Sequence, residues 1–284
     1  MRISVIIPAF NEEKSIGNTI DEMKEVLERN NFNYELIVVN DGSSDDTGKI
    51  AQEKGARLIT HDFNHGYGAS IKAGVRQSKY DVILITDADG TYPTEDIPTI
   101  LRHMENYDMV VGARVGDKVK VSLVRKPAKW LLTKLANYLS ESNIVDLNSG
   151  LRAIKKEVFS KFNKLLPDGF SLTATITLAL VTNGYQVKYI PINYGSRIGK
   201  SKIKPIRDTL NFFQLIIRAS LLFNPLKIFL PIGLGLCFLG IFVFFYSVFS
   251  LPYTLDITAV VLFTSGIQVM AIGLIADLIN KRML

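Results

Sequence analysis

The sequence has a single cysteine among its 284 residues. Cys237 therefore has no partner for an intramolecular disulfide, and a metal site built from several thiolates is excluded. The first residues read as a strand with one arginine and lack a small-residue cleavage site, so we expect no secretory signal. No internal repeat, low-complexity tract or linker is found. A chain of this length suits one domain of good size plus an appendage.

Charge is missing from two long stretches near the C-terminus. Residues 228–249 and 257–276 contain no charged side chain and show no polar face. Each stretch is long enough to cross about 30 Å of hydrocarbon as a helix. We therefore predict a membrane hairpin over residues 227–284, with spans at about 228–249 and 257–279. The alternative, two helices buried in a soluble core, fits two adjoining runs without a polar face less well.

Lysine and arginine are also absent from the connector between these spans, residues 250–256. Basic side chains instead flank the hairpin outside both spans: Lys200, Lys202, Lys204, Arg207, Arg218, Lys227, Lys281 and Arg282. The positive-inside rule then predicts an integral protein of the cell membrane with its N-terminal part and both termini in the cytoplasm. The net charge of +6 favours an anionic partner, and beside a bilayer a lipid phosphate fits better than nucleic acid.

The N-terminal part alternates between strand-like and helix-like segments. Apolar runs predict strands near residues 3–8, 34–39, 57–60, 82–89 and 109–113, with helices between them. This alternation predicts an α/β, doubly wound and mainly parallel sheet in a cytoplasmic domain over residues 1–205. A loop with two glycines, residues 64–69, is interpreted as a place of close backbone packing.

Two later segments are amphipathic. Basic residues within 114–129 precede a helix with one apolar face near 130–139, and a second amphipathic helix is expected within 206–226. Both are predicted to lie on the membrane interface. For the helix near 130–139, the alternative is that it packs on the domain and that its charged rim is solvated.

Carboxylates follow two of the predicted strands. Asp87 and Asp89 end the run 82–89, and Asp41 follows the run 34–39. Because the carboxyl ends of parallel strands meet at one edge of a sheet, we expect the three to gather there. The alternative is that these aspartates only form turns, because aspartate is common in any turn after a strand. Two carboxylates at one strand end can hold Mg2+ or Mn2+ and leave positions open for a diphosphate.

Four motifs stand in a specific order along the chain. They are Pro8-Ala9-Phe10-Asn11-Glu12-Glu13, Asn40-Asp41-Gly42-Ser43-Ser44-Asp45, Asp87-Ala88-Asp89 and Asn148-Ser149-Gly150-Leu151-Arg152. Together they resemble the family-2 glycosyltransferases of GT-A fold, and more narrowly the dolichyl- or polyprenyl-phosphate sugar synthases. The resemblance covers the chain to about residue 204 and extends more loosely into the hairpin.

The resemblance implies which residues serve the reaction. The nucleotide-binding residues would be Pro8, Ala9, Asn11, Glu13, Asp41, Asp87 and Ala88. Asp87 and Asp89 would bind the metal, Mg2+ or Mn2+. The acceptor phosphate and the leaving diphosphate would be held by Arg114, Arg125, Arg197 and Lys202, which with Asp89 form the catalytic set. Lys129 stands where a small polar residue is usual, so no role is assigned to it.

Thr91 departs from the pattern of the mannose synthases, which carry a Gln at this position that helps at the metal. The third protein ligand is therefore left open, and a UDP-sugar is favoured over a GDP-sugar. The expected reaction moves a hexose-type sugar to dolichyl or undecaprenyl phosphate with inversion at the anomeric carbon. The phosphate is ionised at neutral pH, so no strong general base is required.

Two other functions fit the sequence less well. Processive polysaccharide synthases carry Gln-x-x-Arg-Trp, but the only tryptophan, Trp130, is not preceded by that pattern, and two spans make a poor channel. A non-catalytic, nucleotide-binding membrane scaffold would have no need of Asp41, Asp87 and Asp89. The spans could also associate into a homo-oligomer through small residues, namely Gly233, Gly235 and Gly240.

Overall fold

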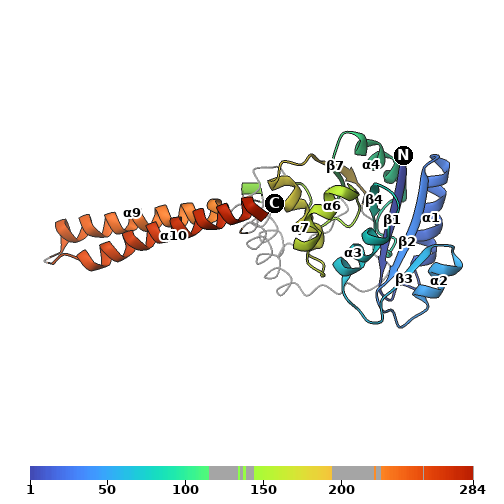
Figure 1. Ribbon diagram of the computed structural model, residues 1–284, viewed down its shortest axis with the longest axis horizontal. Coiled ribbons are helices and arrows are strands. Elements are labelled where there is room, and N and C mark those ends of the chain that lie inside the picture. The colour runs from blue at the N-terminus through green and yellow to red at the C-terminus, as the bar shows by residue number, and fades with distance from the viewer. Residues whose placement is uncertain are drawn as a thin grey trace.

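The computed structural model describes residues 1–114, 134, 137–138, 144–193, 221, 225–251 and 253–283. They form an α/β domain and a helical hairpin, which lies to one side of the domain as an arm (Figure 1). The strands are β1 (Arg2–Ala9), β2 (Asn33–Asn40), β3 (Arg57–Thr60), β4 (Val82–Ile85), β5 (Met109–Arg114), β6 (Arg152–Lys155) and β7 (Val187–Ile192). The helices are α1 (Ile16–Arg29), α2 (Thr47–Glu53), α3 (Tyr67–Gln77), α4 (Ile97–Arg102), α6 (Lys156–Phe162), α7 (Leu172–Thr182), α9 (Leu226–Ser250) and α10 (Asp256–Met283). Three short 3-10 turns are η1 (Thr94–Asp96), η2 (His103–Glu105) and η4 (Asn163–Leu165).

The seven strands form one sheet in the order β3-β2-β1-β4-β6-β5-β7. All neighbouring pairs are parallel except those of β6, which runs antiparallel to both β4 and β5. The mainly parallel sheet is therefore confirmed. The sequence did not predict β6, because its four residues include Arg152 and Lys155 and show no apolar run. The motif Asn148-Ser149-Gly150-Leu151-Arg152 leads directly into this strand.

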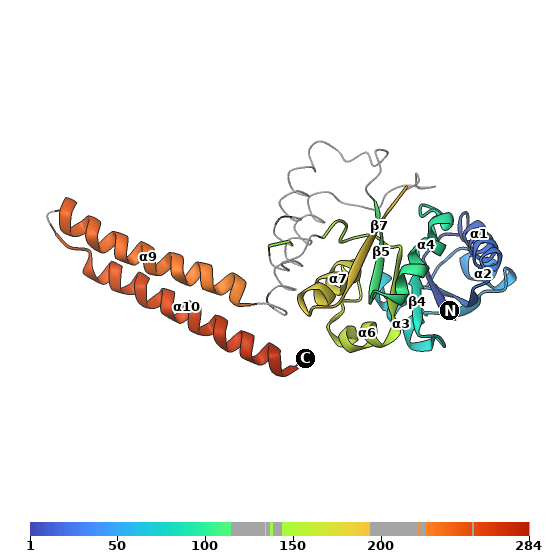
Figure 2. The same ribbon diagram turned by 90° about the horizontal axis from the view of Figure 1, so that it is seen from above.

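Apolar side chains of the sheet pack on both of its faces. In β1, Ile3 and Val5 belong to the core cluster that includes α1 and α4, whereas Ile6 belongs to the cluster with α3, α6 and α7. Alternate residues of a strand point to opposite faces, so an unbroken apolar run fits a strand that is covered on both sides. Figure 2 shows helices on either side of the sheet. Because every strand except β6 runs in one direction, their carboxyl ends share one edge.

The glycine loop before α3 allows the close packing that was expected. Gly66 has a φ of 103°, a conformation that side chains rarely permit. A methyl group added at Gly66 or Gly68 would collide with the backbone of residues 167–169, and the backbone N–H of Ala69 donates to the carbonyl of Asp168. The loop is thus fastened to the segment before α7.

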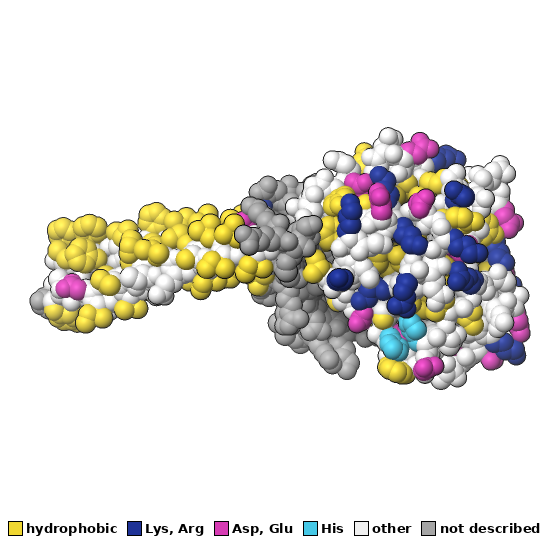
Figure 3. Space-filling view, viewed as in Figure 1, with side chains coloured by type: hydrophobic (Ala, Val, Ile, Leu, Met, Phe, Trp, Pro, Cys, Tyr) yellow, Lys and Arg dark blue, Asp and Glu magenta, His cyan; other side chains and the backbone are white. Residues whose placement is uncertain are grey.

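The two C-terminal helices pair along their length. α9 and the Asp256–Ile279 part of α10 are long and apolar enough to cross a membrane. Hydrophobic side chains cover most of the hairpin seen in Figure 3, while charged side chains are spread over the α/β domain. Small buried residues recur at every seventh position on both helices: Gly233, Gly240 and Ser247 on α9, and Ala259, Gly266 and Gly273 on α10. This spacing keeps one stripe of each helix against the other and lets the backbones approach closely.

Several predictions lie outside the described residues. They concern the side chains of Arg125, Lys129, Arg197 and Lys202, and all but a few residues of the two interfacial helices near 130–139 and 206–226.

A matched pair of glycines tests the hairpin packing. A methyl group at Gly266 would lie 2.5 Å from the Cys237 Sγ and 2.6 Å from the Gly233 carbonyl oxygen, whereas Gly235 meets nothing within 4 Å. Gly266→Leu should therefore destabilise the protein by about 1–3 kcal/mol through overpacking. Gly235→Leu should leave the unfolding temperature of the detergent-solubilised protein nearly unchanged. Equal unfolding temperatures for the two variants would contradict this packing.

Candidate functional site

Asp87 stands two residues beyond the end of β4, at the carboxyl edge of the sheet. The hydroxyl of Tyr67, in the first turn of α3, donates a hydrogen bond of 2.9 Å to its Oδ1. Burial raises the pKa of Tyr67 well above its ordinary value, and the charge of Asp87 raises it further. The Tyr67 hydroxyl therefore stays protonated and acts as a donor that fixes the carboxylate.

Gly150 lies directly against the Asp87 carboxylate. A methyl group on Gly150 would lie 2.6 Å from Oδ1 and 2.7 Å from Oδ2 of Asp87, so only a glycine lets the carboxylate lie against this stretch of backbone. The peptide between Ser149 and Gly150 is held at both ends. Its N–H donates 2.6 Å to the Tyr92 hydroxyl, and its carbonyl accepts from the Nη2 and Nε of Arg152 at 2.5 and 3.2 Å.

Arg152 is fully buried at the start of β6. Its Nη1 donates to the carbonyl of Thr173 at 2.8 Å and to the Thr177 hydroxyl at 3.1 Å, so the guanidinium also ties the 149–150 peptide to α7. Burial lowers the pKa of Arg152, but an arginine stays charged at physiological pH. The sequence motif contained Arg152 without assigning it a role. A buried arginine in a short strand gives no periodic signal that would have revealed this one.

Asp89 is 6% exposed and lies beyond β4 next to Asp87. Thr91 donates to its Oδ1 through both the hydroxyl, at 2.6 Å, and the backbone N–H, at 3.2 Å. The residue that was expected to leave a ligand position open thus orients the carboxylate of Asp89.

Asp41 follows β2 at the same edge and is 3% exposed. Its carboxylate contacts the loop before α3 through the His61 Nδ1 at 2.7 Å and accepts from the backbone N–H groups of His65 and Gly66 at 2.9 and 2.8 Å. Three of its roughly four acceptor positions are engaged, which leaves capacity for one more donor.

The loops after β1 and β2 are joined to each other by Asn11 and Glu13. Asn11 adopts a φ of 54°, its N–H donates to the Ser43 hydroxyl at 3.0 Å, and its Oδ1 accepts from the Ser44 N–H at 2.9 Å. The Glu13 N–H donates to the Asp45 carboxylate at 3.2 Å. These predicted nucleotide-binding residues therefore shape the two loops at the edge.

The other predicted nucleotide-binding residues are buried parts of the same edge. Pro8 and Ala9 end β1, and the Ala9 carbonyl accepts from the Asp41 N–H at 2.9 Å. Ala88, between the two aspartates, is 3% exposed, and its carbonyl accepts from the Thr19 hydroxyl at 3.2 Å. Only their backbones and small side chains can line a pocket here.

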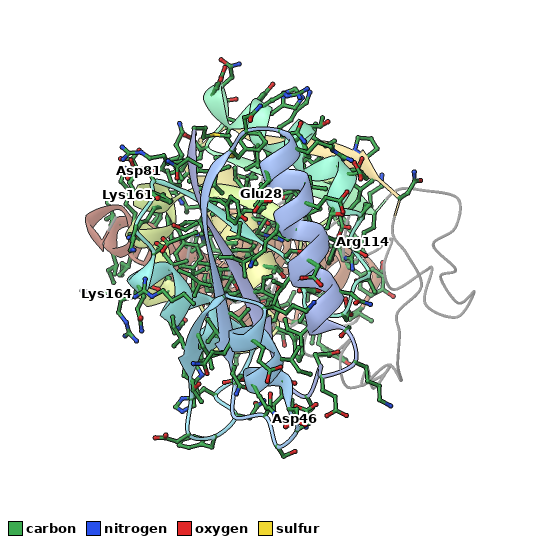
Figure 4. All side chains as sticks on the ribbon, turned by 90° about the vertical axis from the view of Figure 1, so that its right-hand side faces the viewer. Glu28, Asp46, Asp81, Arg114, Lys161 and Lys164 are labelled. Atoms are coloured by element: carbon green, nitrogen blue, oxygen red, sulfur yellow. The ribbon has the colours of Figure 1, made fainter. Side chains whose placement is uncertain are left out.

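Arg114 ends β5 at the carboxyl edge, and Figure 4 shows it on the opposite side of the domain from Asp81, which precedes β4. Its Nε and Nη2 donate to the two carboxylate oxygens of Asp146 at 2.8 and 2.9 Å. Burial alone would raise the pKa of Asp146, but the bonds and charge of Arg114 hold it below the ordinary value. Sequence reasoning selected Arg114 and missed Asp146, its partner.

The chemistry of the donors fits a hard divalent cation. Within the described part of the chain no group of three or more His, Cys, Asp and Glu side chains could hold a metal. Asp87 and Asp89 can supply two carboxylates, and Mg2+ or Mn2+ commonly completes its oxygen ligands with substrate phosphates and water. A pocket of about 430 Å³ that Thr91 helps to line is also lined by Glu22, Glu25 and Glu95, whose charges disfavour a diphosphate.

The contact between Gly150 and Asp87 can be tested with Gly169, whose added methyl group would meet nothing within 4 Å. Gly150→Ala should displace the Asp87 carboxylate and weaken the binding of Mn2+ with UDP at least tenfold, measured by calorimetric titration of the folded protein. Gly169→Ala should bind as the unchanged protein does. Wild-type affinity in Gly150→Ala would show that Asp87 does not take part.

Comparison with known proteins gives two family matches that together span most of the chain. The family described as Glycosyl transferase family 2 matches residues 4–162, and the GtrB C-terminal hairpin matches residues 224–281. The chain is 27% identical over 221 residues to the dolichyl-phosphate hexose transferase of Haloferax volcanii, covering 77% of this chain and 94% of that protein. It is 26% identical over 306 residues to the undecaprenyl-phosphate 4-deoxy-4-formamido-L-arabinose transferase of Pseudomonas fluorescens, covering 98% and 85%.

Solved structures support the fold. The glucosyl-3-phosphoglycerate synthase of Mycobacterium tuberculosis, in complex with Mn2+, UDP-glucose and phosphoglyceric acid, superposes with a TM-score of 0.59 at 20% identity. The match covers 77% of this chain and 79% of that one. The sheet, the carboxylates at its edge and the matched residues lead to one conclusion: the chain belongs to glycosyl transferase family 2 and carries a GtrB-type C-terminal hairpin.

Proposed function

We propose that this glycosyltransferase moves a hexose-type sugar from a nucleoside-diphosphate sugar to a polyprenyl phosphate in the membrane. One observation carries the proposal: the chain that bears the Asp87 and Asp89 site also has a C-terminal hairpin long enough to cross a bilayer. A water-soluble acceptor requires no such anchor. The dolichyl- and undecaprenyl-phosphate relatives support an acceptor of this class.

The donor would bind at the carboxyl edge, with its base near Asp41 and its diphosphate near Asp87 and Asp89. These two carboxylates would hold Mg2+ or Mn2+, and the bound ion would offset negative charge on the leaving diphosphate. Tyr67 and Thr91 keep the two carboxylates in fixed orientations before any donor arrives. Such preorganisation lowers the reorganisation needed in the transition state. We favour a UDP-sugar, on the ground that Thr91 replaces the Gln of the mannose synthases.

The transfer would be a single displacement with inversion at the anomeric carbon. The acceptor phosphate is already an anion, so the protein must hold it and need not deprotonate it. Arg114 is positioned for this role by Asp146, which locks its guanidinium at two points. Arg125, Arg197 and Lys202 are proposed to share the charge of the acceptor phosphate and the leaving diphosphate.

The hairpin would place the reaction at the inner surface of the cell membrane. The absence of Lys and Arg from residues 250–256, against the basic flanks of both spans, supports a cytoplasmic catalytic domain and cytoplasmic termini. In this arrangement residues 1–205 form the catalytic domain, 206–226 lie on the interface and 227–284 cross the bilayer.

The proposal is tested by screening radiolabelled UDP- and GDP-sugars with the purified chain against dolichyl and undecaprenyl phosphate. We expect label in the lipid phase from a UDP-hexose, dependent on Mg2+ or Mn2+ and abolished by EDTA. A short water-soluble phosphate should be a poor acceptor. Efficient transfer to the soluble phosphate, or none to any lipid, would overturn the proposal.

The same assay needs a matched pair of variants. Asp89→Asn keeps the size of the side chain and removes the charge, and transfer should fall by about 100-fold or more. The same change at the exposed Asp62 should leave transfer unchanged.

Arg114 gives a separate prediction on the acceptor. Arg114→Ala should raise the KM for polyprenyl phosphate about tenfold or more, because it removes a charge from the acceptor side, with less than a threefold change in UDP affinity. Arg102→Ala, an exposed arginine of α4, serves as the control. Equal losses for lipid and nucleotide would argue against an acceptor role for Arg114.

A further inference from the structure

Phe170 exposes its aromatic ring just before α7, beside buried residues of the site. The side chain is 82% exposed, and one face of its ring stacks on the ring of Tyr67. The two ring centroids are 5.5 Å apart, and the ring planes differ by 15°. The Tyr67 hydroxyl in turn donates to the Asp87 carboxylate at 2.9 Å. A single tyrosine ring therefore separates an exposed phenylalanine from a carboxylate of the proposed metal site.

The loop that carries Phe170, residues 166–171, is fastened to the first turns of α3. The backbone N–H of Ala69 donates to the Asp168 carbonyl at 3.0 Å, and the Lys72 ammonium pairs with the Asp168 carboxylate at 2.5 Å. Single apolar side chains on a surface are common and need no function. This ring differs from them because its loop holds it in a fixed place beside the site. A group that is already ordered loses little freedom when a ligand binds.

The proposed acceptor side of the site belongs to the other face of the sheet. Side chains alternate along a strand, and Val110 of β5 packs in the core cluster that includes α1 and α4. Arg114 follows Val110 by four residues on the same strand, so it shares that face. Tyr67 instead packs against the cluster with α3, α6 and α7. A lipid whose phosphate is held by Arg114 thus approaches from the face opposite to Phe170.

The nucleobase of the donor is also placed away from this ring. In the proposed function the base lies near Asp41, whose carboxylate is bound by backbone N–H groups of the loop before α3. The Tyr67 side chain reaches from the end of that loop to Asp87, where the diphosphate would bind. Phe170 stacks at this second end. The part of the donor that follows the diphosphate is the hexose.

We propose that the open face of the Phe170 ring packs against the hexose of the donor and makes Phe170 a specificity-determining residue for the sugar. The inference rests on the donor orientation in the proposed function. A pyranose ring presents C–H groups on which an aromatic ring can pack, while its hydroxyls stay available to polar partners. In a displacement with inversion, the leaving diphosphate and the acceptor phosphate lie on opposite sides of the anomeric carbon. Phe170 covers the sugar from a third side and touches neither reacting group.

The test compares nucleotides with and without a sugar on the full-length chain. Calorimetric titration in the presence of Mn2+ gives the Kd of UDP, UDP-glucose, UDP-galactose, GDP and GDP-mannose. For the nucleotide that binds, Phe170→Ala should raise the Kd of a nucleotide sugar about fivefold or more and leave that of the bare nucleotide within about twofold. Phe170→Tyr keeps the ring and should bind as the unchanged chain does. Phe170→Leu is apolar but has no flat ring, so it should behave as Phe170→Ala does.

Leu165→Ala is the control, because Leu165 is another exposed apolar side chain and lies in η4, just before the same loop. It should bind every one of these ligands as the unchanged chain does. Equal weakening of bare nucleotide and nucleotide sugar in Phe170→Ala would show that the ring only supports Tyr67 and Asp87. An unchanged Kd for every nucleotide sugar would show that the ring does not reach the sugar. Either result overturns the proposal, as does an unchanged chain that binds none of the ligands.

The sugar-transfer assay separates this proposal from the proposed function. With the sugar that the unchanged chain transfers, Phe170→Ala should raise the KM for the donor and leave the KM for polyprenyl phosphate unchanged. A raised KM for the lipid alone would assign the ring to the isoprenoid chain and overturn the proposal. A sugar-dependent loss of affinity in a chain that labels no lipid would refute only the function. Lipid labelling with a donor KM that Phe170→Ala leaves unchanged would refute only the sugar contact.

Discussion

The hydrogen bonds between Arg152 and the carbonyl of Ser149 connect the sheet, a helix and the site. Through them a buried guanidinium holds one peptide in place, and that peptide forms the wall against which the Asp87 carboxylate lies. Leaving such a peptide unsatisfied in the interior would be expensive, so the cation and the carbonyl stabilise each other. The geometry of Asp87 thus depends on a residue that touches no substrate in the proposed reaction.

The other charged side chains at this edge of the sheet are likewise held by a neighbouring residue before any ligand binds. Thr91 orients Asp89, the loop before α3 encloses Asp41, and Asp146 holds Arg114. Donors and acceptors that are fixed in advance lose little freedom on binding. The glycines beside them, Gly66 and Gly150, are required because a side chain would enter space that the backbone or a carboxylate occupies.

The hairpin applies a different constraint to the same chain. Its two helices cannot be held together in lipid by the hydrophobic effect, so they depend on close contact between small residues at every seventh position. That pattern uses one side of each helix and leaves the other side to the surroundings.

Much of the architecture could be read from local patterns. The apolar runs predicted β1 to β5 within a few residues, their shared direction placed Asp41, Asp87 and Asp89 at one edge, and the charge-free stretches predicted both helices of the hairpin. These features depend on residues close together in the sequence, where periodicity and length are sufficient. The site's predicted basic residues other than Arg114 lie beyond the described residues, and the roles of all four, Arg114 included, stay predictions.

Only the tertiary structure decided the contacts between segments that are distant in the chain. The strand β6 shows no apolar run, yet it pairs with both β4 and β5 in the sheet, and its Arg152 is bonded to Ser149 and to α7. The same is true of the pairing of Arg114 with Asp146 and of Tyr67 with Asp87, residues 32 and 20 positions apart. By itself the sequence determined which chemical groups reach the carboxyl edge of the sheet. Strands that alternate with helices run parallel, so the residues that follow them gather at that edge. Tertiary packing decided how each group is held, because a hydrogen bond depends on distances that no local pattern encodes.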